Sequence, residues 1–310
     1  MTSFLPVKAE DYKKCMEQRP VTIETSMGPV EYAARGEGPV LLSVHGGPGG
    51  YDQGLAISES FRLNGFRIIA PSRPGYLGTP LSSGQSLESQ GDALAALLDV
   101  LGLDRVAVLG ASAGGPSTYL MAQNHPDRVS ALIEIDSVCM RYTKADEISK
   151  AEELLFMSKA GMWLMDFLMS HFPAAMIKSF LQTESSLAEH EIRERVRQVL
   201  KDPAKLAMVE VLSRTMTTRY EERKAGVAND LEKMRSLDRL PLDKVDCPTL
   251  IIHGNADNDV PPAQAEYAAR SIADSELYWI DKGSHMGFWL ADAAETVQQY
   301  AVKWLREQVS

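Results

Sequence analysis

The stretch GASAGG, residues 110–115, directly follows the apolar run Val106–Leu109 and precedes a helix-like segment. A glycine-rich turn between a strand and a helix can bind a phosphate, bind a dinucleotide or present a nucleophile. A phosphate-binding Walker A loop requires Lys after its last glycine, where this chain has Pro116. A dinucleotide fingerprint requires the glycine spacing GxGxxG, which neither GASAGG nor HGGPGG at 45–50 provides. The remaining match is GxSxG, in which a tight strand-to-helix turn presents the hydroxyl of Ser112.

The composition is typical of a folded globular protein. Of 310 residues, 45% are hydrophobic and 24% charged, which predicts one large core with room for an accessory domain. The net charge of -10 and the lack of a basic run argue against a nucleic-acid partner. The three cysteines lie far apart with no CxxC spacing, so they predict neither disulfides nor a thiolate metal site. Because no signal sequence or membrane-spanning apolar run is evident, we expect a cytoplasmic protein with no membrane partner.

Short apolar runs alternate with helical patterns along most of the chain, and each run predicts a strand. The predicted strands are Val21–Glu24, Val30–Arg35, Val40–Val44, Phe66–Ala70, Val106–Leu109, Leu132–Ile135, Leu250–Ile252 and Leu277–Ile280. Helical spacing predicts a helix over Ser86–Leu101, ending at Gly102, and a closing helix over Ala291–Gln308. We expect the first two strands to form a hairpin and the later ones to be parallel. The pattern predicts an α/β fold whose mostly parallel, twisted sheet is covered by helices on both faces.

One long segment interrupts this alternation. The roughly 110 residues before Cys247 read almost entirely as helix, too many for a single crossover. We therefore predict a helical cap (lid) at 137–244, inserted in a core made of residues 1–136 and 245–310. Two helix starts are visible inside it: Ser186–Glu189 has the spacing of a capping box, and Asp202 precedes a proline.

Four motifs follow one another in a fixed order: HGGPGG at 45–50, GASAGG at 110–115, HGNADNDVP at 253–261 and GSH at 283–285. Together they resemble the signatures of the α/β-hydrolase superfamily, and the resemblance covers the chain from about residue 20 to its end. It implies the α/β-hydrolase fold. In the superfamily's chain order, it also implies Ser112 as nucleophile, Asp257 as orienting acid and His285 as general base.

Two other aspartates are alternative candidates for the orienting acid. Asp259 lies two residues beyond Asp257, and Asp136 ends the predicted strand before the cap, where some members of the superfamily carry their acid. Asp257 is favoured because it occupies the signature position. The alternative role for the other two is that of loop or helix-cap carboxylates.

Among the six histidines, His285 is favoured as the base. It follows the last predicted strand in a Gly-Ser loop and comes after the acid in the chain. His45 and His253 each precede a glycine at the end of a predicted strand, a position typical of a hydrogen-bonded turn. The others lie on helical or linker patterns, and we expect structural roles for them: His125, His171 and His190.

Backbone amides are expected to form the oxyanion hole, since fixed dipoles stabilise developing charge without reorganising. Ala113, directly after the nucleophile, supplies one N–H. The second comes from the HGGPGG loop, where Pro48 has no N–H to donate. Gly47 is the predicted donor, with Gly46 as the alternative.

A serine at position 112 predicts acyl transfer, because superfamily members that open epoxides or displace halides carry an aspartate there. HGGPGG resembles the loop of proline iminopeptidases, but Ala113 stands where they have Trp, and residues 71–76 read PSRPGY instead of their DQRG. Carbon-carbon hydrolases usually have Met after the serine and Trp after the histidine, where this chain has Ala113 and Met286. Carboxylic ester cleavage is therefore favoured. Amide, thioester or carbon-carbon cleavage, and a weakly catalytic ligand-binding receptor, stay as alternatives.

The predicted cap is rich in methionine: nine of the fourteen lie between Met140 and Met234. Methionine adapts to irregular apolar shapes, so we expect a lid over an apolar substrate, with Phe156, Trp163 and Met165 in contact with it. The same side chains could instead form ordinary core between cap and sheet. We predict a serine hydrolase that cleaves a small to medium apolar ester through an acyl-enzyme, with no metal or cofactor.

Overall fold

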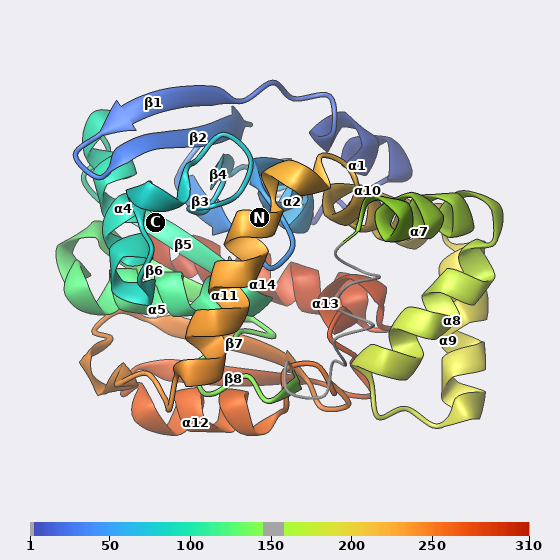
Figure 1. Ribbon diagram of the computed structural model, residues 1–310. Coiled ribbons are helices and arrows are strands. Elements are labelled where there is room, and N and C mark those ends of the chain that lie inside the picture. Colours follow the sequence, from blue (N-terminus) through green and yellow to red (C-terminus); the bar gives the residue numbers. More distant parts are fainter. Residues whose placement is uncertain (1–2, 145–157, 310) are drawn as a thin grey trace.

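The computed structural model describes residues 3–144 and 158–309, and its centre is one eight-stranded sheet (Figure 1). The strand order is β1-β2-β4-β3-β5-β6-β7-β8. The strands are β1 (Val21–Thr25), β2 (Gly28–Arg35), β3 (Val40–Val44), β4 (Arg67–Pro71), β5 (Val106–Ala111), β6 (Val129–Ile135), β7 (Thr249–Gly254) and β8 (Ser275–Ile280). β1 and β2 form an antiparallel hairpin, β2 is antiparallel to β4, and all other neighbours are parallel. The predicted mostly parallel sheet is confirmed.

Apart from the partly exposed edge strand β8, the parallel strands are almost entirely buried on both faces, which explains their mainly apolar sequences. Successive side chains of a strand point to opposite faces. On β3, Leu41 packs into the core on one side of the sheet and Leu42 into the core on the other, and both are fully buried.

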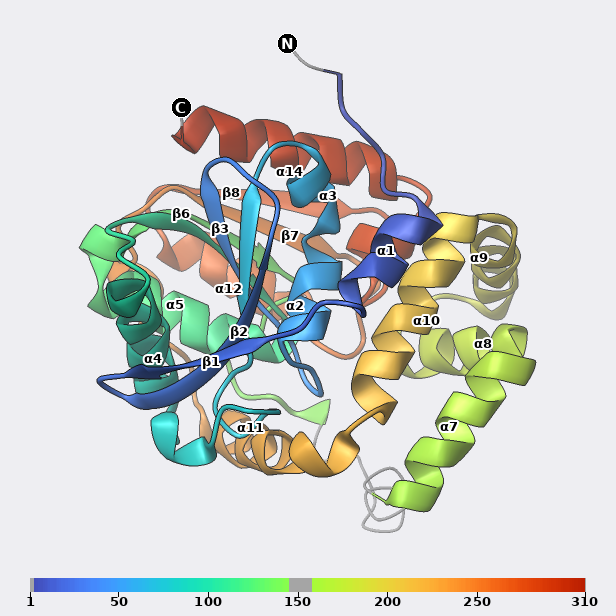
Figure 2. The same ribbon diagram turned by 90° about the horizontal axis from the view of Figure 1, so that it is seen from above.

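Helices cover both faces (Figures 1 and 2). The helices α2 (Tyr51–Ile57), α3 (Glu59–Leu63), α13 (Gly287–Leu290) and α14 (Ala294–Val309) pack on the Leu41 side, together with α1 (Ala9–Cys15). The helices α4 (Leu87–Val100), α5 (Gly115–Asn124) and α12 (Ala263–Ser271) pack on the Leu42 side. Short 3-10 turns cover Leu81–Ser83, Ser112–Gly114, Pro126–Arg128, Tyr220–Glu222 and Leu242–Lys244. In the described part of the chain, no helix combines the length and apolar character needed to cross a bilayer.

The helix ends follow local chemistry. The Ser86 hydroxyl caps α4 by accepting from the Ser89 N–H at 3.1 Å, and Gly102 after its end has φ 64°, the left-handed conformation that glycine adopts most easily. The last helix begins at Ala294, three residues later than predicted, because Ala291 has extended backbone angles that end α13.

The segment between β6 and β7 is helical where the structure describes it. It contains α7 (Lys159–His171), α8 (Pro173–Glu184), α9 (Glu189–Lys201), α10 (Pro203–Thr217) and α11 (Lys224–Ser236). In both views α7 to α10 gather beside one end of the molecule, whereas α11 lies apart from them (Figures 1 and 2). That residues 137–244 form a separate cap stays a prediction.

One of the two predicted helix starts in this segment is confirmed. The Asp202 carboxylate accepts from the amides of Ala204 and Lys205, as an N-cap does. The capping box at Ser186 is wrong, because α9 begins at Glu189 and the Ser186 N–H instead donates to the Ala256 carbonyl at 2.9 Å.

Candidate active site

Ser112 lies in a strained turn between β5 and α5. Its φ is 51°, in the left-handed region that a residue with a side chain adopts only at a cost. The glycines on both sides are required by close packing: a Cβ on Gly110 would lie 2.3 Å from the Thr118 Oγ1, and one on Gly114 would lie 2.6 Å from the His45 carbonyl oxygen. The turn leaves Ser112 only partly buried.

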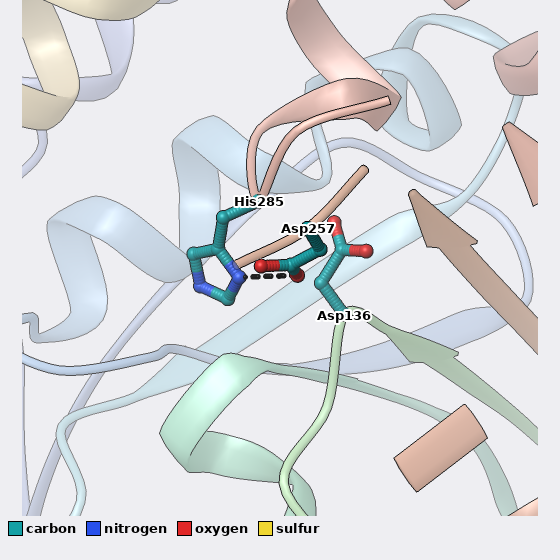
Figure 3. Close-up of side chains that lie close together, drawn as sticks. All are labelled: Asp136, Asp257 and His285. Atoms are coloured by element: carbon teal, nitrogen blue, oxygen red, sulfur yellow. Dashed lines mark hydrogen bonds and ion pairs between the residues drawn. The ribbon is translucent and has the colours of Figure 1, made fainter. Parts of the chain in front are cut away.

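The structure brings Ser112 and His285 together, although 173 residues separate them in the chain. His285 lies in the loop after β8, and its Nε2 is 3.0 Å from the Ser112 Oγ. Its Nδ1 is 2.8 Å from the Oδ2 of Asp257, which lies in the loop after β7 (Figure 3). The imidazole therefore bridges the hydroxyl and the carboxylate.

Backbone amides fix the orientation of the Asp257 carboxylate. Its Oδ1 accepts from the N–H of Asp259 at 2.8 Å and from the N–H of Val260 at 3.0 Å. Its Oδ2 is left to accept from the Nδ1–H of His285, and this assigns the neutral tautomer whose Nε2 can accept a proton from Ser112.

Neither rival carboxylate contacts Nδ1 of His285. Asp259 accepts from the Tyr142 hydroxyl at 2.7 Å, and its Oδ2 is 3.5 Å from Nε2, on the side that faces Ser112. Asp136 directly follows β6 and accepts from the Gly254 N–H at 2.9 Å. In Figure 3 Asp257 lies between His285 and Asp136. The geometry thus favours Asp257 as the orienting acid.

Asp136, Asp257 and His285 could in principle each offer one ligand atom to a metal, since these atoms lie within 4.8 Å of one another. The contacts fit a hydrogen-bonded triad better. Both nitrogens of His285 and both oxygens of Asp257 already have partners. Burial, with the nearby Asp257 charge, raises the pKa of Asp136 well above its ordinary value.

Charge around His285 favours its protonated form. Burial alone would lower the pKa of His285, but the carboxylates of Asp257 and Asp259 outweigh it and raise the pKa well above 6.5. A general base gains from this arrangement, because the imidazolium formed during the reaction is stabilised.

The predicted oxyanion donors lie on neighbouring loops. A Cβ on Gly47 would lie 3.5 Å from the Ala113 Cβ. The Gly46 N–H donates to the Gln53 Oε1 at 2.9 Å, so this amide is engaged and Gly47 is favoured over it. That Gly47 and Ala113 bind an oxyanion stays a prediction.

His45 and His253 make the turn hydrogen bonds expected of them. The His45 Nδ1 is 2.6 Å from the Gly46 carbonyl oxygen, and its Nε2 accepts from the Arg73 N–H at 2.9 Å. Burial, with the neighbouring Arg73, lowers the pKa of His45 well below 6.5, so the ring is neutral. The His253 Nε2 is 2.9 Å from the Val260 carbonyl oxygen.

The three residues predicted to contact a substrate, Phe156, Trp163 and Met165, differ in their surroundings. Phe156 lies outside the described residues. Trp163 is 66% exposed and stacks on Phe167, with 5.6 Å between ring centroids. Met165 is buried in the apolar core. Contact of these three with a substrate stays a prediction.

A hollow beside His285 was not predicted. Its lining is mostly apolar and comes from α8, α10, α13 and the loop after β8: Ile177, Phe180, Leu181, Glu184, Val209, Ser284, Met286 and Leu290. Burial raises the pKa of Glu184, at its edge, to about 7. The carbonyl of Glu184 also accepts from the Asn258 N–H at 3.2 Å, so the end of α8 is tied to the loop that carries Asp257. Ser284 and Met286 flank His285 in the sequence, but no local motif marks the lining residues of α8 and α10, because only tertiary folding brings them to His285.

Known proteins resemble this chain over most of its length. Residues 39–292 match a protein-family model described as alpha/beta hydrolase fold. The uncharacterized hydrolase YcgS of Bacillus subtilis is 30% identical over 91% of this chain and 96% of its own. The pimeloyl-(acyl-carrier protein) methyl ester esterase of Aromatoleum aromaticum is 28% identical over 81% of this chain and 92% of its own. A solved structure, an alpha/beta hydrolase fold protein from Nakamurella multipartita, has a TM-score of 0.87 at 38% identity, over 93% of this chain and 99% of that one.

Proposed function

The chain belongs to the α/β-hydrolase family, and we propose that it is a serine hydrolase that cleaves a small to medium, apolar carboxylic ester through an acyl-enzyme. The observation that carries this proposal is the position of His285, with one ring nitrogen 3.0 Å from the Ser112 hydroxyl and the other 2.8 Å from the Asp257 carboxylate. A serine hydroxyl becomes a useful nucleophile when a base is within hydrogen-bond distance and a third group orients that base.

Acylation begins at Ser112. Its Oγ attacks the ester carbonyl carbon while the His285 Nε2 accepts the hydroxyl proton. Asp257 holds the Nδ1–H and stabilises the imidazolium. The amides of Gly47 and Ala113 donate to the oxyanion of the tetrahedral intermediate.

His285 then returns the proton to the leaving alkoxide. The alcohol departs, and the acyl group stays on Ser112 as an ester. In deacylation His285 takes a proton from water, the hydroxide attacks the acyl carbon, and the free acid leaves as Ser112 recovers its proton.

One observation supports an apolar substrate, and another supports an ester bond. The hollow beside His285 is lined mainly by aliphatic, Met and Phe side chains, and this apolar surface suits an apolar acyl or alkyl group, although the hollow itself, at about 10 Å³, has room for little more than one water molecule. The similar protein from Aromatoleum aromaticum is named as a methyl ester esterase, and the same bond type suits the mechanism above.

A substrate panel tests the proposal. We expect turnover of p-nitrophenyl esters with short to medium acyl chains, and little or no turnover of prolyl amides and carbon-carbon hydrolase substrates. The Ser112→Ala variant should lose this turnover, whereas Ser236→Ala, at an exposed serine in the last turn of α11, should keep it. Preferential cleavage of amides or carbon-carbon bonds would contradict the ester proposal, and ligand binding without any turnover would favour a receptor.

A further inference from the structure

The loop at 45–50 is held by buried side chains that reach it from outside the sheet. We propose that helix α11 positions this loop for catalysis, with Asp230 and Arg223 as its positioning residues. The inference rests on the proposed function, because it concerns the oxyanion hole of that reaction.

The orientation of the Gly47 N–H depends on the Gly46 carbonyl. The two groups belong to one planar peptide unit, so fixing the carbonyl fixes the direction of the N–H. The Gly46 carbonyl oxygen lies 2.6 Å from the His45 Nδ1 and accepts from the Arg73 guanidinium at 3.3 Å. Arg73 also donates from Nε to the His45 carbonyl at 3.0 Å. Donation to this carbonyl also polarises the peptide and strengthens its N–H as a donor.

Asp230 of α11 holds Arg73 in this position. Its carboxylate accepts two bonds from the guanidinium, at 2.9 Å and 2.6 Å, in the two-pronged geometry that suits arginine. The side chains of Arg73 and Asp230 are only 2% and 4% exposed. The Tyr76 hydroxyl donates to the same carboxylate at 2.6 Å. Arg73 also donates to the Gln90 Oε1 at 3.2 Å, and these bonds together confine the guanidinium to one orientation.

Arg223, paired with Asp52, holds the other end of the loop at 45–50. Arg223, which directly precedes α11, donates to the Gly49 carbonyl at 2.6 Å and to both oxygens of Asp52. Its side chain is fully buried. One end of the loop is therefore bonded directly to Arg223, and the other end is bonded to Arg73, which Asp230 of α11 holds.

Helix α11 packs closely against Gly75 and Tyr76, which fixes its position. The Gly226 N–H donates to the Gly75 carbonyl at 2.9 Å, and a Cβ on Gly226 would lie 2.2 Å from the Tyr76 ring. In Figure 1 α11 crosses in front of the sheet, apart from α7 to α10. The α11 segment thus completes the support of the oxyanion loop, which the core alone does not supply.

The test compares an ester with its thionoester, in which sulfur replaces the carbonyl oxygen and gains less from an oxyanion hole. The variant Asp230→Asn is compared with Glu232→Gln, the same chemical change on the same helix at a side chain that is 70% exposed. For Asp230→Asn we expect kcat for the ester to fall about 10-fold to 100-fold, less than the 10²–10³ for complete loss of a donor, with KM little changed. The ester-to-thionoester rate ratio should fall with it, and Glu232→Gln should match the wild type.

Tyr76→Phe provides a milder variant that leaves the Arg73–Asp230 ion pair and its charges in place. Loss of one hydrogen bond predicts a fall of the same ratio by about twofold to tenfold. The role of α11 is overturned if both variants fold and the ester-to-thionoester rate ratio is unchanged in both. If Asp230→Asn does not fold, an unchanged rate ratio in Tyr76→Phe alone overturns it. A wild-type protein without ester hydrolysis refutes the proposed function instead, and the inference with it.

Discussion

Replacement of Asp257 by Asn should remove most of the activity without unfolding the protein. The Oδ1 of Asp257 accepts from two backbone N–H groups, of Asp259 and Val260. In the variant the carboxamide oxygen must stay on these amides, which turns its NH₂ toward His285. The NH₂ then donates to Nδ1, and the proton of the imidazole is placed on Nε2. In this tautomer His285 cannot accept the proton of Ser112.

The size of the effect follows from this change of tautomer. The corresponding Asn substitution in a serine protease triad lowers kcat by about 10⁴-fold. Four orders of magnitude correspond to about 5 kcal/mol of lost transition-state stabilisation. Because both backbone amides keep an acceptor, we expect the free energy of unfolding to change little.

The assay is initial-rate hydrolysis of a p-nitrophenyl ester, with urea unfolding of the same preparations. Asp136→Asn is the matched control, since Asp136 is also buried and close to Asp257 but has no contact with Nδ1 of His285. A near wild-type kcat for Asp257→Asn would refute the reasoning. So would an equal loss in Asp136→Asn.

Two further predictions concern pH and stability. His285 must be neutral to act as a base, so activity is retained at high pH and lost as the pH falls through its raised pKa. The Asp259→Asn variant removes one of the carboxylates that raise this pKa. It should therefore move the acidic limb of the kcat/KM profile to lower pH. An unshifted limb would show that Asp259 does not act on His285. Phe61 is fully buried and stacks on Phe288. In urea titration, Phe61→Ala should lower the free energy of unfolding by about 3–5 kcal/mol. The control Leu5→Ala, at a side chain that is 52% exposed, should change the free energy of unfolding by less than about 0.5 kcal/mol. A small loss for Phe61→Ala would contradict the assigned core.

Much of the sheet is predictable because its signals are local. Val40–Val44 is an apolar run, interrupted only by Ser43, between a glycine turn and the glycine-rich segment at 45–50, and β3 has these bounds. The short helix α2 was not predicted. It contains Gly54, a poor helix former, at a position where a Cβ would lie 2.8 Å from the Ser43 carbonyl oxygen. Close packing on the sheet requires that glycine, and no local pattern indicates it.

The residues of the candidate site also differ in whether local sequence signals predict them. Ser112, Asp257 and His285 each lie in a loop directly after a strand, and the carboxyl ends of parallel strands meet at one edge of a sheet, so motif order is enough to nominate them. Arg73 and Asp230 are 157 residues apart, and neither lies in a motif that points to the other. Their pairing depends on how α11 docks, which is a tertiary property.

Ser112 as the nucleophile is the central claim, and covalent labelling tests it most directly. A fluorophosphonate should add one phosphonyl group to the native protein, and peptide mass spectrometry should locate it on the Ser112 Oγ. The Ser112→Ala variant should remain unlabelled under the same conditions. Labelling of another residue, or unchanged labelling of Ser112→Ala, would contradict the account.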